Sequence, residues 1–84
     1  MSGWIDELAE TLRVEALTES EARQLLGVAR EVAHRMERKD TPLAAFLLGM
    51  HVACQTADGT ARSDALAQAI GTTDALLPPA PEGP

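Results

Sequence analysis

Two histidines and a single cysteine are the most reactive side chains in this sequence. His51 and Cys54 lie three positions apart in a segment that we expect to be helical, so both could contribute to one metal site. A zinc site needs at least three protein ligands, and only His34 or a carboxylate could complete this one. A buried thiol beside a histidine at the helix edge is the simpler interpretation. We therefore expect no metal ligands.

A nucleophile–base pair is the second chemistry that these residues could support. It would require Cys54 as the nucleophile and His34 as the base. Nothing in the sequence brings the two together, and no third group is recognisable that would orient the base. Glycine-rich phosphate loops, paired-cysteine motifs and histidine–glutamate zinc motifs do not occur. We expect no catalytic residues and no cofactor, and the protein is not expected to be an enzyme.

The best candidate for binding is a group of basic residues. Arg30, His34 and Arg38 follow one another at four-residue spacing and therefore line one side of a helix, with Arg35 and Lys39 close by. Such a group can bind an acidic protein surface, a phosphate or a nucleotide. The alternative, which we favour, is a solvated helix end that compensates the helix dipole and pairs with nearby acids. Those acids are Glu10, Glu31 and Glu37.

Length and composition describe one small domain of 84 residues with a net charge of −6. An acidic chain with one modest basic segment is a poor nucleic-acid binder, because phosphate binding needs several converging cations. A single cysteine excludes an intrachain disulfide. No apolar run approaches the ~20 residues of a membrane span, and the N-terminus lacks a signal-peptide pattern. We expect a cytoplasmic protein that binds neither nucleic acid nor membrane.

Local signals predict where the first two helices lie. Trp4, Leu8 and Leu12 recur at helical spacing and predict a short amphipathic helix of about ten residues. Thr18 and Glu21 have the spacing of a capping box, in which each side chain accepts a hydrogen bond from the other residue's backbone N–H. A second helix is therefore expected to begin directly after Thr18.

The second half of the chain contains two further predicted helices. Pro42 ends one helix before it and fits the first turn of the next, which we expect to reach Thr56. Thr60 or Ser63 can cap a fourth helix, Gly71 is expected to end it, and a further helical turn can follow from Asp74 to Leu77.

These elements predict an all-α fold, a compact bundle of four short helices within residues 1–77. The proline-rich segment at residues 78–84 is expected to be a disordered tail. The third helix should be central, because it is almost entirely apolar. The predicted core consists of Trp4, Ile5, Leu8, Leu12, Leu25, Leu26, Ala29, Val32, Met36, Leu43, Phe46, Leu47, Met50, Ala53, Leu66 and Ile70.

The apolar circumference of the third helix also predicts association. Ala45, Leu48 and Val52 lie on the side opposite Leu43 and Phe46 and are candidates for a homodimer or partner surface. The alternative is a monomer in which the first and fourth helices cover the third helix from both sides. A protein partner or a homo-oligomer is the interpretation that we favour.

One combination of residues extends across several of these helices. It comprises Trp4, Leu25, Val28-Ala29-Arg30, Val32-Ala33-His34, Arg38, Thr41-Pro42-Leu43 and Phe46-Leu47-Leu48-Gly49. The combination, within residues 4–70, resembles an uncharacterised family of small helical domains that occur alone or appended to molybdenum-cofactor guanylyltransferase-like proteins. The resemblance implies a non-enzymatic accessory or protein-interaction domain associated with molybdenum-cofactor metabolism. The alternative is a small-ligand-binding module in which Arg30, His34 and Arg38 hold the phosphate of a nucleotide or pterin.

Overall fold

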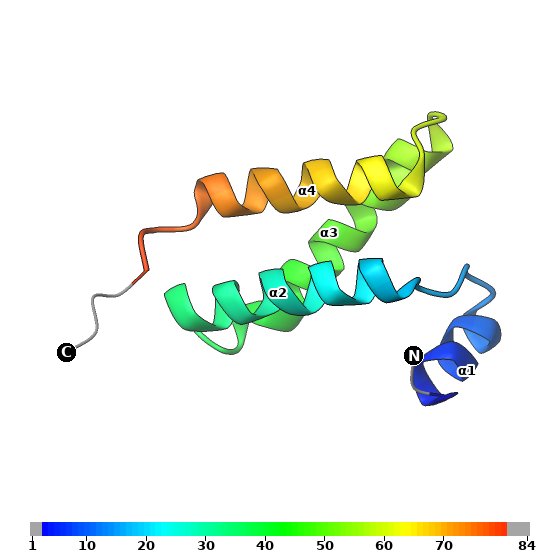
Figure 1. The fold of residues 1–84 in the computed structure, drawn as a ribbon, viewed down its shortest axis with the longest axis horizontal. Helices are drawn as coiled ribbons and strands as arrows, with labels where there is room; N and C mark the ends of the chain where they lie inside the picture. The colour runs from blue at the N-terminus through cyan, green and yellow to red at the C-terminus, as the bar shows by residue number, and fades with distance from the viewer. Residues whose placement is uncertain (1–2, 81–84) are drawn as a thin grey trace.

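The computed structural model describes residues 3–80 and contains four helices in that range. They are α1 (Gly3–Leu12), α2 (Glu19–Arg35), α3 (Asp40–Ala57) and α4 (Arg62–Leu76) (Figure 1). No strand occurs among residues 3–80, so the predicted all-α class is confirmed. Of the predicted tail, residues 78–80 follow the last helix without regular structure, and residues 81–84 lie outside the described residues.

The start of α2 follows the sequence prediction. Thr18 is the N-cap residue, and its hydroxyl oxygen accepts a hydrogen bond of 3.1 Å from the Glu21 N–H. The Glu21 carboxylate in turn accepts a hydrogen bond of 2.8 Å from the Thr18 N–H. The reciprocal capping box satisfies two backbone donors that the first turn would otherwise leave unpaired.

The predicted break between the second and third helices near Pro42 is also confirmed, although α3 begins two residues before Pro42, at Asp40. The Asp40 carboxylate accepts a hydrogen bond of 3.1 Å from the Glu37 N–H and so closes the turn between the two helices. Pro42 lies in the first turn of α3, where its missing N–H removes no helical hydrogen bond.

Two predictions about α4 are wrong. The helix continues through Gly71 to Leu76, because a single glycine costs a helix only about 1 kcal/mol relative to alanine. Neither Thr60 nor Ser63 is the N-cap; that position is Ala61, which makes no side-chain capping bond. The tertiary contacts of α4 override both local signals.

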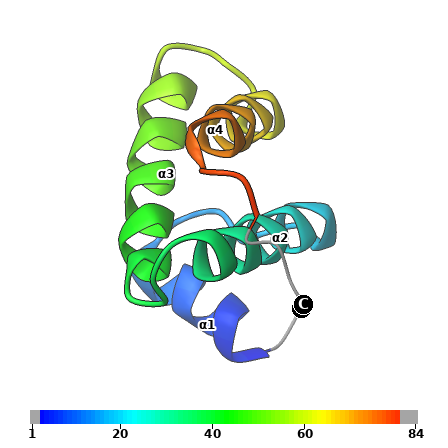
Figure 2. The ribbon, with the colours of Figure 1, turned by 90° about the vertical axis from the view of Figure 1, so that its left-hand side faces the viewer.

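Three of the four helices form the packed body of the protein. α2 and α4 run in the same direction, and α3 crosses them on one side (Figures 1 and 2). Within residues 3–80, α1 packs against none of these three helices and has no buried residue. The buried apolar residues are Ala22, Val28, Val32, Leu48, Ala65, Leu66 and Ala69.

The predicted core was wrong for most of its residues. Val32 and Leu66 are buried as predicted, whereas ten others are exposed. These ten are Trp4, Leu8, Leu12, Leu26, Met36, Leu43, Phe46, Leu47, Met50 and Ala53. The main reason is the orientation of α3, which packs with Leu48 toward the other helices. Small residues around Leu48, such as Ala44 on α3 and Ala69 on α4, allow the helices to approach closely.

The same orientation corrects the predicted association surface. Leu48 is buried against Val28, Val32 and Ala69, so it cannot form an exposed patch. Val52 is partly buried against the same cluster, and only Ala45 of the three predicted residues is exposed.

Candidate functional site

The most unusual surface of the protein is the side of α3 that points away from α2 and α4. Leu43 and Met50 each lie three and four residues from the adjacent pair Phe46 and Leu47, so the four share one side of the helix, which we call the outer face of α3. Each of these side chains is between 52% and 69% exposed. Scattered exposed leucines are normal, but four large apolar side chains on one helical stripe form a contiguous patch.

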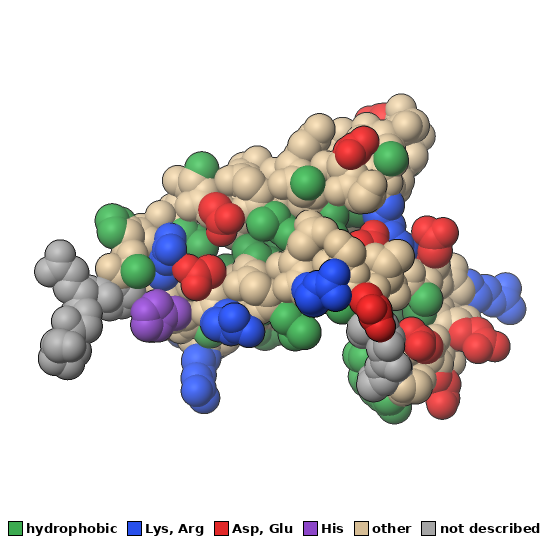
Figure 3. All heavy atoms as spheres, viewed as in Figure 1, with side chains coloured by type: hydrophobic (Ala, Val, Ile, Leu, Met, Phe, Trp, Pro, Cys, Tyr) green, Lys and Arg blue, Asp and Glu red, His purple; other side chains and the backbone are tan. Residues whose placement is uncertain are grey.

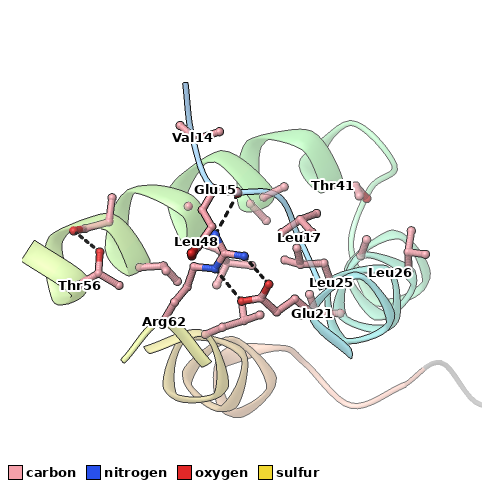
Figure 4. Close-up of a pocket in the computed structure, with 18 of the residues that line it drawn as sticks. Val14, Glu15, Leu17, Glu21, Leu25, Leu26, Thr41, Leu48, Thr56 and Arg62 are labelled. Atoms are coloured by element: carbon pink, nitrogen blue, oxygen red, sulfur yellow. Dashed lines mark hydrogen bonds and ion pairs between the residues drawn. The ribbon is translucent and has the colours of Figure 1, made fainter. Parts of the chain in front are cut away.

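A second apolar feature lies between α2 and α3, and we call it the α2–α3 groove. It is a cavity of about 720 Å³, closed at one end by residues 14–17 and α4 (Figure 4). The exposed Leu26 stands at its edge on α2. Small residues form much of its walls, namely Ala29 on α2 and Ala44, Ala45, Gly49 and Ala53 on α3. These short side chains leave open space along one wall, and leucine and valine side chains line most of the rest.

Arg62 closes the end of this groove by holding the segment before α2 against α4 (Figure 4). Its guanidinium donates to both carboxylate oxygens of Glu21, with a distance of 2.7 Å from Nε to Oε2. It also donates to the backbone carbonyls of Glu15 (3.0 Å) and Ala16 (2.6 Å). Arg62 thereby connects three chain segments, and we call this set of bonds the Arg62 clamp.

The clamp changes the ionisation of Glu21. Its side chain is buried, which alone would raise the pKa, but the Arg62 hydrogen bonds and those of Thr18 lower the pKa from 4.5 to about 2. The same bonds from Glu21 raise the pKa of Arg62. Both groups are therefore charged and mutually neutralised at neutral pH, so the pair holds the fold and leaves no free charge for catalysis.

The predicted basic group is at the end of α2, where Figure 3 shows a histidine and several Lys or Arg side chains. Arg30, His34 and Arg38 are exposed and form no ion pair within the described part of the chain. Arg35 pairs with Glu31 at 2.8 Å, as the solvated-face interpretation expects. Lys39 likewise pairs with an acid of its own segment, Glu37 at 3.2 Å.

The cysteine and histidine on α3 are both exposed, so the expectation of a buried thiol is wrong. His34, which was considered as a base for Cys54 and as a third metal ligand, lies on a different helix, α2. Among residues 3–80, no group of three or more His, Cys, Asp or Glu side chains is arranged to hold a metal ion.

Sequence reasoning found one half of the clamp and missed the other. Glu21 was predicted as a capping residue, but its partner Arg62 is 41 positions away. Arg62 stands out in the sequence as the only Lys or Arg after Lys39, but no local pattern connects it with Glu21.

Comparisons with known proteins give a family but no function. None of the helices within residues 3–80 has the length and hydropathy that crossing a bilayer requires. Neither the curated proteins nor the solved structures contain a significant match. A family described as "Domain of unknown function (DUF6457)" does match, and this description contains no link to molybdenum-cofactor guanylyltransferases. The match covers residues 1–82, almost the whole chain, and the protein therefore belongs to the DUF6457 family.

Proposed function

We propose that this protein is a non-enzymatic interaction domain that docks onto another protein through the outer face of α3. The observation that supports it most directly is the exposure of Leu43, Phe46, Leu47 and Met50 on a helix whose other side is packed in the core. At roughly 200 Å² for a fully accessible large side chain, these four expose on the order of 500 Å². Apolar patches of that size on a small protein are often binding surfaces.

The chemistry of the patch favours a protein partner. Phe46 and Met50 are residue types that interface centres favour, and no charged side chain interrupts the stripe. A cytoplasmic location is part of the proposal. The single cysteine supports it, because small secreted domains usually depend on disulfides.

The resemblance noted from the sequence suggests which partner to test first. A guanylyltransferase-like protein of molybdenum-cofactor metabolism is the candidate, and we propose an accessory role for the domain beside such a protein. The basic end of α2 would then add charge contacts at the edge of the interface, through Arg35, Arg38 and Lys39.

A small anionic ligand is the second candidate, and one observation favours it. Arg30, His34 and Arg38 are exposed at four-residue spacing, and none is engaged in an ion pair among residues 3–80. Two acids weaken this candidate, because Glu31 and Asp74 lie beside Arg30 in a shallow hollow between α2 and α4.

Binding of a purified guanylyltransferase-like protein to the immobilised domain tests the leading candidate. The wild type should bind, and Phe46→Glu should lose binding because a charge replaces a central apolar side chain. Ala67→Glu adds the same charge at an exposed position of α4 and should bind normally.

Thermal shift with GTP, a pterin phosphate and molybdate tests the second candidate. No stabilisation is expected. A specific stabilisation that disappears in Arg30→Ala would support the anion site in place of the docking face.

A further inference from the structure

We propose that the α2–α3 groove binds the α1 helix of a second copy of this chain, so that two copies exchange their α1 helices in a symmetric dimer. This inference goes beyond the proposed function, because it uses a different surface from the outer face of α3. It starts from α1, which packs against none of the other three helices within residues 3–80, and from the apolar groove between α2 and α3.

α1 is an amphipathic helix without a core to pack on. Trp4 is 67% exposed and Leu12 is 61% exposed, and Leu8 lies between them on the same stripe. α1 has only 10 residues, and an isolated helix of this length is unstable in water. Burial of this stripe against another surface would therefore stabilise both the helix and the contact.

The chain keeps α1 away from its own groove. Arg13 closes α1 in the left-handed conformation, with φ of 59°, and the Val14 N–H donates to the Ala9 carbonyl over 2.9 Å. The next two residues, Glu15 and Ala16, are held by the Arg62 clamp. Figure 1 shows α1 beside the start of α2, below the three packed helices. Because the residues that follow α1 are held in this way, α1 stays exposed and can contact a second copy.

The groove has the shape that a helix requires. Ala29 on α2 and Ala45, Gly49 and Ala53 on α3 are small, so a helix can approach the walls closely. A Cβ atom placed on Gly49 would meet no atom within 4 Å, so the space beside this glycine is open.

The charges of the two surfaces are complementary. α1 carries Asp6, Glu7 and Glu10 and no base. On α2, Arg23 and Arg30 lie three positions before and four positions after Leu26, which lines the groove, and Arg30 also borders the hollow between α2 and α4. Both arginines are exposed and unpaired within residues 3–80. Figure 3 shows basic side chains on either side of a hydrophobic one along this edge of α2, and acidic ones gathered over α1.

The area is sufficient for a stable dimer. At roughly 200 Å² for each fully accessible large side chain, Trp4, Leu8 and Leu12 expose on the order of 330 Å². Each docked helix covers a similar area of the groove, and the symmetric dimer contains two such contacts. The total is on the order of 1,300 Å², within the range of about 1,200–2,000 Å² that stable interfaces bury.

Sedimentation of the full chain at micromolar concentration tests the inference. The wild type should have twice the monomer mass of 8.9 kDa. Leu8→Glu, which places a charge in the α1 stripe, and Gly49→Leu, which fills the groove, should each be monomeric and folded. Gly71→Leu is the matched control, because Gly71 is also a helical glycine with open space but lies on α4 outside the groove. It should remain a dimer.

Mixing the two monomeric variants tests the exchange itself. Leu8→Glu keeps an intact groove and Gly49→Leu keeps an intact α1, so an equimolar mixture should form a heterodimer with one of the two contacts. Because it buries half of the wild-type interface, this heterodimer should be weaker than the wild-type dimer and form at higher concentration, where each variant alone stays monomeric. A wild-type monomer would overturn the inference, and so would a dimer that survives Gly49→Leu. A dimer that is lost in Phe46→Glu but not in Gly49→Leu would show that the copies meet at the outer face of α3, which would instead revise the proposed function.

Discussion

The Arg62 clamp makes the stability of this protein depend on the charge of Glu21, which Glu21→Gln removes while the Glu15 carboxylate remains 3.3 Å from Arg62. Glutamine keeps the length of the side chain and can still accept the capping hydrogen bond from the Thr18 N–H. What it loses is the negative charge that neutralises the guanidinium of Arg62. The variant therefore separates the ion pair from the helix cap.

The lowered pKa of Glu21 gives the size of its contribution to the free energy of unfolding. The pKa of Glu21 falls from 4.5 to about 2, and each pKa unit corresponds to about 1.4 kcal/mol, so ionisation of Glu21 contributes about 3 kcal/mol to the free energy of unfolding. A domain of this size has a total stability of only about 4–13 kcal/mol. Because the pKa is lower in the folded state, this contribution is complete above about pH 5 and is lost as the pH falls toward 2.

Urea unfolding, followed by the helical circular dichroism signal, provides the assay. Near neutral pH, Glu21→Gln should unfold with about 3 kcal/mol less free energy than the wild type, and the difference should shrink on acidification. Glu19→Gln is the control, because Glu19 carries the same charge in the same first turn but is exposed. Its cost should stay below about 1 kcal/mol. Equal costs for the two variants would refute the argument.

Two further predictions follow from the packing and the backbone. Leu48→Ala should cost about 2–5 kcal/mol in urea unfolding because Leu48 is buried, whereas Leu47→Ala, beside it but exposed, should cost less than about 1 kcal/mol; similar costs would show that α3 is oriented differently. Arg13→Gly should relieve the left-handed conformation of a non-glycine residue, worth about 1 kcal/mol, and slow amide exchange at Val14 about fivefold. Unchanged exchange would mean that Arg13 is not strained.

The sequence predicts the features of this fold that depend on neighbouring residues. Thr18 and Glu21 are three positions apart, so the capping box and the start of α2 could be recognised before the structure. Pro42 likewise indicated the break between α2 and α3. Such signals act within one helical turn, so they can be recognised without knowing how the helices pack against one another.

The orientation of α3 could not be predicted in the same way. Phe46 and Leu48 are both apolar, and a helix that is apolar on all sides gives no periodic signal for its buried side. The prediction placed the stripe of Leu43, Phe46 and Leu47 in the core. The structure instead buries Leu48, which packs against Val28, Val32 and Ala69. The partner of Glu21 was hidden for a related reason, since a contact over 41 positions leaves no local pattern.

The two sides of α3 differ in burial, and the proposed docking role of the outer face would explain why so small a protein contains so apolar a helix. Leu48 and Val52 contribute to folding, because they pack against α2 and α4. Leu43 and Phe46 contribute little to the stability of an isolated chain, because they remain more than half exposed. Exposed apolar side chains lower solubility without strengthening the fold, so their clustering on one stripe is best explained by recognition. It follows that substitutions on the two sides should separate stability from binding, which few domains of this size allow within one helix.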